Sequence, residues 1–290
     1  MSARAWIEAA RPATLPVAIA PVLVGAAAAH TVGRVDGAAM GAALAGALLL
    51  QVGANLANDV YDAELGADNA ARLGPRRAVA SGLIRAGTVK RAMLVVFALA
   101  VAVGGWLAAR AGWPVVAIGV VSILAAVAYT APPLSLGYRG LGDLCVLLFF
   151  GAAGVCGTCL VAIHRVPKVA MLAAIPVGAL ATAVLVINNL RDRATDAPVG
   201  KRTLAVRFGR RFAVAELFAL FAAAHLAAPL AVLLGLARMP VLLALGTLPW
   251  AVQLAGRVAR SDGRALNPLL GAAARLLLAH ATLLAAGLWL

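Results

Sequence analysis

Nine long apolar runs dominate this 290-residue chain. Hydrophobic residues make up 63% of the sequence and charged residues only 12%, whereas a soluble domain carries about 25% charged residues. A globular core of this length cannot bury so much apolar surface, so the surrounding solvent must be lipid. Several runs approach the roughly 20 residues that carry an α-helix across a bilayer. We predict membrane-spanning helices over residues 13–29, 38–56, 92–109, 115–129, 144–163, 169–187, 212–233, 241–256 and 269–289.

A β-barrel and a signal peptide both fit the apolar runs less well than membrane helices do. A transmembrane β-barrel needs short strands of alternating polarity, but these runs are apolar on every side. A secretory signal peptide could end near Ala29, but Pro16 and Pro21 interrupt that run, and we expect it to be retained as the first span. No polar linker divides the chain. We therefore expect an all-α membrane protein with a single domain over residues 1–290.

Lysine and arginine residues gather on one side of the predicted membrane. With the N-terminus placed inside, the inside segments hold 19 of them and the outside loops hold five. This asymmetry predicts a cytoplasmic N-terminus and an external C-terminus. We expect a multi-pass protein of a bacterial or archaeal cytoplasmic (inner) membrane. The net charge of +14 follows largely from this topology, so it indicates no nucleic-acid partner.

The stretch NLANDVYDAELGAD, residues 55–68, holds four of the 11 acidic residues in the chain. Helical spacing places Asn55, Asp59 and Asp62 on one face at the end of the second span. Charges at a helix end are ordinarily solvated caps or topology signals. One acidic patch alone would therefore favour a structural interpretation.

A second acidic patch follows the sixth span at the same predicted membrane depth. Its residues Asn188, Asp192 and Asp196 have i, i+4 and i+8 spacing and fall on one helix face. Acidic residues at the membrane edge are functional-site candidates, and two matched patches favour that interpretation over a structural one. We expect the two patches to face each other.

The residues in and around both patches indicate a metal-bridged diphosphate site. Neighbouring carboxylates repel one another unless a cation neutralises them, and Mg²⁺ is held by a few carboxylates together with water and substrate phosphate. Arginine and lysine match phosphate oxygens. Such basic residues follow or accompany the acids at Arg72, Arg76, Arg77, Arg191, Lys201 and Arg202.

Cysteine and histidine residues offer little additional chemistry. Cys156 and Cys159 form a C-x-x-C pattern inside an apolar span without a second ligand pair nearby, so we expect them to pack as small residues. The four histidines are scattered away from both acidic patches, and we expect packing or surface roles for them.

The acidic patches resemble the two aspartate-rich motifs of the UbiA superfamily of intramembrane prenyltransferases. The resemblance covers nearly the whole chain and is strongest to the branch that prenylates 1,4-dihydroxy-2-naphthoate in menaquinone synthesis. NNLRD-x-x-TD followed by GKRTLAVR-x-G is specific to that branch. The similar stretches are WIEAARPATLPVAIAPVLVG (6–25), NLANDVYDAELGAD (55–68), RLGPRRAVASGLI (72–84), YTAPPLSLGYRGLGD (129–143), NNLRDRATDAPVGKRTLAVRFG (188–209) and NPLLGAAARL (267–276).

This resemblance implies nine transmembrane helices around a central cavity that opens to the cytoplasm and sideways to lipid. It also implies that Mg²⁺-diphosphate is held by Asn55, Asp59, Asp62, Asp192 and Asp196. Asp68 follows the spacing of the naphthoate branch. Lys201 and Arg139 resemble diphosphate ligands, with Tyr129 near the same group.

The implied activity is Mg²⁺-dependent transfer of a polyprenyl group from polyprenyl diphosphate to 1,4-dihydroxy-2-naphthoate, with loss of CO₂ and diphosphate, giving demethylmenaquinol. Asp62 or Asp68 is the candidate acceptor of the proton. Another aromatic acceptor, such as 4-hydroxybenzoate or homogentisate, is the alternative within the superfamily. A membrane ion or solute transporter is the alternative from a different class, but transporters place polar site residues near the membrane midplane, and here the acids lie at one face.

Overall fold

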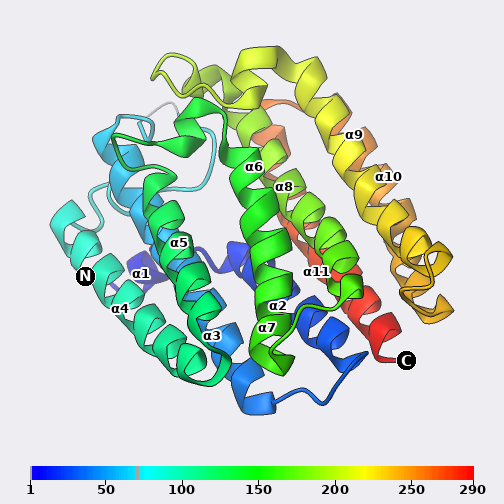
Figure 1. Ribbon diagram of the computed structural model, residues 1–290. Coiled ribbons are helices and arrows are strands. Elements are labelled where there is room, and N and C mark those ends of the chain that lie inside the picture. Colours follow the sequence, from blue (N-terminus) through cyan, green and yellow to red (C-terminus); the bar gives the residue numbers. More distant parts are fainter. Residues whose placement is uncertain (1, 70–71) are drawn as a thin grey trace.

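The computed structural model describes residues 2–69 and 72–290, and every regular element within these ranges is helical. The α-helices, labelled in Figure 1, are α1 (Ala3–Ala10), α2 (Leu15–His30), α3 (Gly37–Glu64), α4 (Ala86–Ala111), α5 (Trp113–Ala128), α6 (Gly142–Val146), α7 (Gly157–Ile163), α8 (Lys168–Asp196), α9 (Leu204–Leu233), α10 (Leu248–Arg260) and α11 (Asn267–Trp289). The remaining segments are the 3₁₀ helices η1 (Pro12–Thr14), η2 (Leu136–Arg139), η4 (Met239–Thr247) and η5 (Gly263–Leu266), and the π-helix η3 (Leu147–Cys156).

The predicted all-helical membrane class is confirmed. In the described part of the chain, eight helical segments are long and apolar enough to cross a membrane, and α5 is a shorter apolar helix of 16 residues. Each predicted span falls within one of these nine segments, apart from 115–129, which runs one residue beyond α5. Several segments extend up to ten residues beyond the predicted ends, as α3 does to Glu64 and α8 does to Asp196. The count of nine therefore depends on α5, which at about 1.5 Å per residue is shorter than a typical hydrocarbon core.

Helices from distant parts of the sequence pack side by side. Figure 1 shows α3, α4 and α5 on one side of the bundle and α9 and α10 on the other, with α6 and α7 between them. α8 packs against α9 and the π-helix η3, while α11 packs against α2 and η4. The chain termini therefore contribute to the same core, because α2 and α11 are neighbours.

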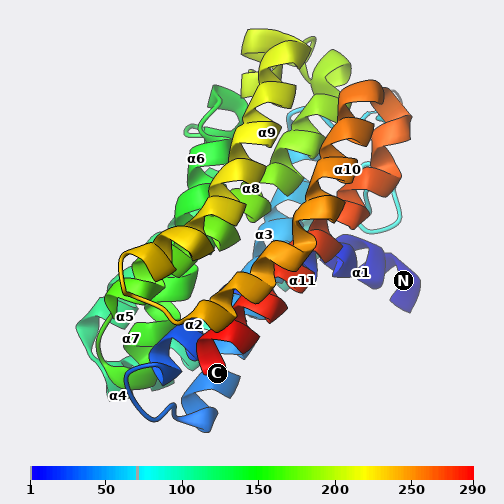
Figure 2. The ribbon, with the colours of Figure 1, turned by 90° about the vertical axis from the view of Figure 1, so that its right-hand side faces the viewer.

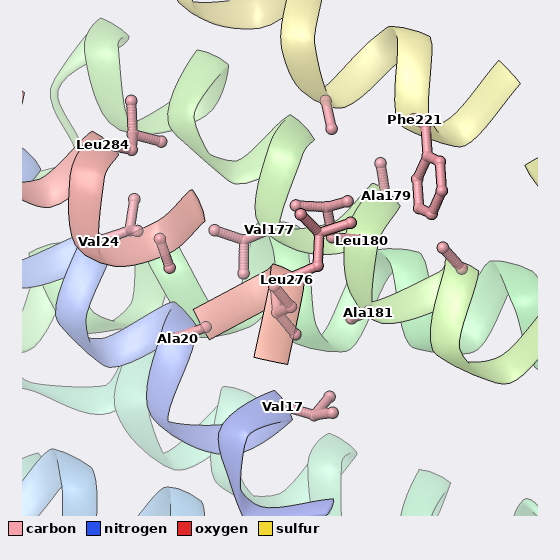
Figure 3. Close-up of a cluster of buried hydrophobic side chains, with 14 of the residues drawn as sticks. Val17, Ala20, Val24, Val177, Ala179, Leu180, Ala181, Phe221, Leu276 and Leu284 are labelled. Carbon is pink, nitrogen blue, oxygen red and sulfur yellow. The ribbon is translucent and has the colours of Figure 1, made fainter. Parts of the chain in front are cut away.

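The core lies where α2, α8, α9 and α11 meet. Figure 3 shows Val24, Leu180, Phe221 and Leu276 converging there from these four helices. Small residues allow closer contacts at its edge. A Cβ atom on Gly178 would lie 2.7 Å from the Leu147 carbonyl oxygen, so α8 and the π-helix meet backbone to backbone.

The two cysteines of the C-x-x-C pattern pack as expected. Both are free, and the buried Cys159 thiol donates a 3.1 Å hydrogen bond to the carbonyl oxygen of Gly25 on α2. A Cβ on Gly25 would lie 2.6 Å from the Val155 carbonyl oxygen. Small residues therefore bring α2 and this part of the chain together, which is their structural role.

The N-terminal segment breaks sharply before the first span. Figure 2 shows α1 running across the direction of the long helices, and α1 packs beside α3. The break falls at Arg11, whose backbone is left-handed at φ 52°, and Pro12 begins the next segment. The search for long apolar runs did not predict α1, because this helix is short and only the face that carries Ala5 and Ala9 is buried.

Two histidines form a buried polar network at a break in the eighth span. η4 changes to α10 at Thr247, and this hydroxyl lies 3.0 Å from Nε2 of His225 on α9 and 2.8 Å from Nδ1 of His280 on α11. Nδ1 of His225 lies 2.8 Å from the Phe221 carbonyl oxygen, so it carries the hydrogen and Nε2 faces the hydroxyl. One hydroxyl therefore links three membrane helices. These two histidines therefore have the packing role that was expected, and they fill it by hydrogen bonding between helices.

Replacing Thr247 with valine should destabilise the bundle, because it leaves two buried imidazole nitrogens without their shared partner. We expect the free energy of unfolding to fall by about 1–2 kcal/mol. Thermal denaturation in detergent measures the change. Thr282→Val is the matched control, because Thr282 is exposed and its hydroxyl donates a hydrogen bond to the Leu278 carbonyl oxygen of its own helix. Equal melting temperatures for both variants would contradict the prediction.

Candidate active site

A cavity of about 960 Å³ connects a charged end to an apolar end. It lies between α2, α3, α4, α5, α7, α8 and α11, with the π-helix η3 also contributing. The charged end is formed by the last turns of α3 and α8 and the loops that follow them. The polar lining residues are Glu8, Arg11, Thr14, Gln51, Asn55, Asn58, Asp62, Arg72, Arg76, Arg77, Ser122, Tyr129, Thr158, Asn188, Asn189, Arg191 and Lys201. Residues of both predicted motifs therefore border one common space.

The first motif points in three directions from α3. Asn55 donates 2.9 Å hydrogen bonds to the Ala10 carbonyl oxygen and to the Thr14 hydroxyl, so it ties α3 to the N-terminal break. Asp62 borders the cavity and accepts a 2.8 Å hydrogen bond from the Tyr138 hydroxyl. Asp59 lies between them at 1% exposure, behind the cavity lining. The three residues lie on one helix face, as predicted, but each side chain has different surroundings.

The loop after α3 brings arginines back onto the acids. The Asp68 carboxylate forms ion pairs with Arg72 and, at 3.1 Å, with Arg77. Arg77 also lies 3.6 Å from Asp62, so one guanidinium group spans two carboxylates. Arg72 and Arg77 border the cavity, while Asp68 is buried behind them.

The second motif is held by an internal ion pair on α8. Arg191 donates to both oxygens of Asp192, at 2.7 and 2.5 Å, and to the side-chain oxygen of Asn188 at 2.8 Å. It also donates a 3.1 Å hydrogen bond to Asn267, which begins α11. Arg191 is only 2% exposed, although it borders the cavity. The Asp192 carboxylate is therefore already neutralised by a neighbour in sequence.

Asp196 and Lys201 form the other half of the second motif. Asp196 ends α8, and Lys201 reaches back to it at 3.5 Å from the loop before α9. Burial lowers the pKa of Lys201, but the carboxylates of Asp62 and Asp196 outweigh that effect and raise it. Lys201 therefore carries a positive charge that borders the cavity between the two motifs.

The loop between α5 and α6 contributes residues that the motifs alone did not single out. The Thr130 hydroxyl donates a 2.5 Å hydrogen bond to Asn58, one turn before Asp62. Tyr138 contacts Asp62 from the same loop. In the sequence, Thr130 and Tyr138 are marked only by their position on either side of the Pro132–Pro133 turn. Their partners are more than 70 positions away, so local spacing could not reveal these contacts.

Tyr129 and Arg139 were both predicted near the diphosphate, but only Tyr129 borders the cavity. Tyr129 borders the cavity, and burial raises its pKa well above the ordinary value, with Asp143 adding to the effect. Its phenol is therefore neutral and able to donate a hydrogen bond. Arg139 lies outside the cavity lining, where it donates a 2.7 Å hydrogen bond to the Pro133 carbonyl oxygen.

The acidic residues leave some buried oxygens that fit a cation. Among the described residues, no group of three or more His, Cys, Asp or Glu side chains is close enough to hold a metal by itself. Within the same ranges, both oxygens of Asp59 and Oδ2 of Asp196 are buried without a hydrogen-bond partner, although the backbone N–H groups of Ala78 and Val79 approach Asp59. Unpaired buried carboxylate oxygens are costly, and a hard cation completed by substrate phosphate would satisfy them.

The bundle and its cavity define the class of this chain, a multi-pass membrane protein whose apolar cavity ends in a charged site. A solved structure of a UbiA homolog from Archaeoglobus fulgidus bound to DMAPP and Mg²⁺ has the same fold, with a TM-score of 0.68 over 96% of this chain and 98% of that one at 16% identity. Residues 18–289 match the UbiA prenyltransferase family. The chain belongs to this family and is a membrane-embedded prenyltransferase.

Curated relatives extend the similarity. The 1,4-dihydroxy-2-naphthoate octaprenyltransferase of Escherichia coli K12 is 42% identical over 212 residues, which cover 71% of this chain and 69% of that protein. The protein of the same name from Mycobacterium tuberculosis H37Rv is 42% identical over 204 residues, covering 70% of each chain. The resemblance stated from the motifs is therefore confirmed at the level of the family and of its naphthoate branch.

Gly74 should be intolerant of a side chain because of its contact with the second motif. A Cβ at this position would lie 2.7 Å from Nη2 of Arg191, so in Gly74→Ala the guanidinium group or the loop must shift, and we expect the contact of Arg191 with Asp192 to weaken. We expect kcat/KM for the prenyl diphosphate to fall by about tenfold, the size of one lost charged hydrogen bond. Gly87→Ala on α4 is the control, because a Cβ there meets nothing within 4 Å. Equal kinetics for the two variants would show that the Arg191 position is unimportant.

Proposed function

We propose that this protein transfers a polyprenyl group from polyprenyl diphosphate to 1,4-dihydroxy-2-naphthoate at the charged end of its cavity. The observation that carries the proposal is that residues from both acidic motifs border one space whose other end is apolar. Relatives at 42% identity named 1,4-dihydroxy-2-naphthoate octaprenyltransferase support the same acceptor. A diphosphate with a long hydrocarbon tail needs both kinds of surface in one cavity.

The diphosphate head would bind between the two motifs. Arg72, Arg77 and Lys201 border the cavity there and supply positive charge for phosphate oxygens. Asp59, Asp62 and Asp196 are the residues that would hold Mg²⁺, because they keep free or partly free carboxylate oxygens. Bound Mg²⁺ would neutralise the diphosphate and make it a better leaving group. Asp192 would act indirectly, through the position of Arg191.

The reaction breaks the allylic C–O bond and forms a C–C bond to the aromatic ring. The leaving electron pair stays with the diphosphate, and the allylic carbon becomes the electrophile. When the attacked ring carbon carries the carboxylate, the electron pair of the ring–carboxylate bond returns to the ring and CO₂ departs. Apolar walls from α4, α5 and η3 keep water away from the cationic carbon during this step.

The apolar end of the cavity would hold the isoprenoid tail. Among its lining residues, Val101 on α4 and Val116 and Val120 on α5 are at least half exposed. We expect the cavity to open to lipid between these two helices. Six glycines widen this part of the lining: Gly46, Gly104, Gly105, Gly119, Gly154 and Gly157.

We assign the charged end of the cavity to the cytoplasmic side of a bacterial or archaeal cytoplasmic membrane. Basic residues are frequent around the loops after α3 and α8, with six from Arg72 to Arg91 and seven from Arg191 to Arg211. Loops with an excess of lysine and arginine lie preferentially on the cytoplasmic side of the membrane. The N-terminus is then cytoplasmic and the C-terminus external, and a prenyl diphosphate made in the cytoplasm can reach the site.

The proposal is tested by mass analysis of products from purified enzyme with a labelled prenyl diphosphate. We expect prenylation of 1,4-dihydroxy-2-naphthoate with loss of CO₂, and no product from 4-hydroxybenzoate or homogentisate. Asp62→Asn should lower turnover by at least about 100-fold, because the proposed site loses a charged ligand. Glu64→Gln is the control on the same helix, since Glu64 is exposed and, among residues 2–69 and 72–290, forms an ion pair only with Lys90. Product from hydroxybenzoate alone would overturn the acceptor assignment.

Side chains added at the cavity glycines should shorten the prenyl chain that the enzyme accepts. A Cβ on Gly104 or Gly119 meets nothing within 4 Å, so leucine fits there but narrows the apolar end. We expect kcat/KM for octaprenyl diphosphate to fall by about tenfold while that for geranyl diphosphate changes little, because a buried leucine side chain displaces several methylene contacts. Gly41→Leu on α3, outside the cavity lining, is the control. Equal losses for both substrates would contradict a tail site here.

A further inference from the structure

The two acidic motifs do not hydrogen-bond to each other directly in the described structure; a tyrosine lies between them. Tyr138 belongs to η2, in the loop between α5 and α6, and neither motif contains it. It contacts Asp62 of the first motif and Lys201 beside the second. The side chain of Tyr138 therefore meets both sides of the site.

The hydroxyl group of Tyr138 fixes the carboxylate of Asp62. It donates a 2.8 Å hydrogen bond to Oδ1, while Arg77 approaches the other oxygen at 3.6 Å. A carboxylate has no hydrogen to donate, so the hydrogen of this 2.8 Å bond comes from the phenol. The phenol is therefore protonated and serves as a donor. The hydrogen bond to Oδ1 orients the Asp62 carboxylate, while Oδ2 forms the longer ion pair with Arg77.

The ring and the backbone of Tyr138 contact the segment after the second motif, at Lys201 and Arg202. Nζ of Lys201 lies 5.4 Å from the ring centroid, within the range of a cation–π contact. The Tyr138 carbonyl oxygen accepts a 2.8 Å hydrogen bond from the backbone N–H of Arg202. Lys201 in turn lies 3.5 Å from Asp196. One residue therefore connects the end of α3 to the end of α8 through a short series of direct contacts.

We propose that Tyr138 is a positioning residue that holds Asp62 and Lys201 at a set separation, so that the two motifs bind one metal-diphosphate group together. The inference rests on the proposed function, because it names the residue that aligns that site. Its hydroxyl and its ring have separable tasks. The hydroxyl orients the carboxylate that would hold the metal, and the ring orients the ammonium group that would meet the phosphate.

Two substitutions separate these tasks. Tyr138→Phe removes only the hydroxyl and keeps the ring beside Lys201, whereas Tyr138→Leu removes both contacts. Tyr61→Phe is the matched control, because Tyr61 is the neighbour of Asp62 on α3 but faces Lys90, at 5.5 Å from its ring. All three proteins are purified in detergent as full-length chains. Their melting temperatures are recorded first, so that a fold defect is recognised.

The first measurement is independent of turnover. Mn²⁺ substitutes for Mg²⁺ at hard oxygen ligands and its binding can be followed by electron paramagnetic resonance in the presence of inorganic pyrophosphate. We expect Tyr138→Phe to raise the apparent Kd for Mn²⁺ by about tenfold, the size of a lost charged hydrogen bond, and Tyr61→Phe to leave it unchanged. Unchanged Mn²⁺ binding in a folded Tyr138→Phe protein would overturn the proposal.

The second measurement separates the effect of Tyr138 on metal binding from its effect on binding of the prenyl diphosphate. In Mg²⁺ titrations of prenyl transfer, we expect Tyr138→Phe to need about tenfold more Mg²⁺ for half-maximal rate, with kcat nearly restored at saturation. Tyr138→Leu should also raise KM for the prenyl diphosphate. A lowered kcat that excess Mg²⁺ does not restore, with unchanged Mg²⁺ dependence, would overturn the positioning role.

The two measurements distinguish failure of this inference from failure of the proposed function. If wild-type protein bound neither Mn²⁺ with pyrophosphate nor prenyl diphosphate, the proposed function and this inference would both be wrong. If the wild type bound Mn²⁺ and was active while Tyr138→Phe matched it in both assays, only the role of Tyr138 would be wrong.

Discussion

Neutralisation of buried charge is the constraint on which the arrangement of the charged end depends. Carboxylates at the edge of an apolar bundle are stable only when a cation or several donors face them. Arg72 and Arg77 meet Asp68, and Arg191 meets Asp192. These pairs are complete within the protein, so they organise the loops around the site. In the described part of the chain, Asp59 and Asp196 keep buried oxygens without a hydrogen-bond partner, and Asp62 and Asp196 have only long ion pairs, at 3.6 and 3.5 Å, so the proposed chemistry falls on these three residues.

The loops convert two separate helix ends into one site. α3 and α8 each carry a motif on their last turns, but helix packing alone does not align the side chains of one motif with those of the other. The α5–α6 loop reaches Asn58 and Asp62 on α3, and its Tyr138 backbone accepts a hydrogen bond from Arg202 beyond α8. Asn267 at the start of α11 adds a further contact to Arg191. The charged end therefore depends on four segments of the chain that are remote in sequence, which gives it a defined geometry despite its position on loops.

Much of the fold and part of the site follow from local sequence patterns. The spans could be predicted because a helix in lipid must be apolar on every side, a property that any window of about 20 residues reveals. The motif residues could be predicted because acids are scarce in such a chain. α1 could not, because an amphipathic segment of eight residues has no span-like signal. The position of Arg139 outside the cavity and the inward pairing of Arg191 also required tertiary contacts, since a basic residue next to an acidic motif has the same local sequence in either case.

The sequence by itself determined that this chain is an all-helical membrane protein with two acidic motifs at one membrane face, because hydrophobicity and helical periodicity are properties of neighbouring residues. The tertiary structure alone decided how each carboxylate is paired and which of its oxygens lack a hydrogen-bond partner, and it placed Tyr138 between the motifs. The contacts of Tyr138 depend on distances between residues that are more than 60 positions apart. The ion pairs join residues that are close in sequence, but they too depend on the distances that the folded loops and side chains set. The strength of a charge interaction depends on such distances and on burial, and neither can be obtained from the spacing of residues along the chain.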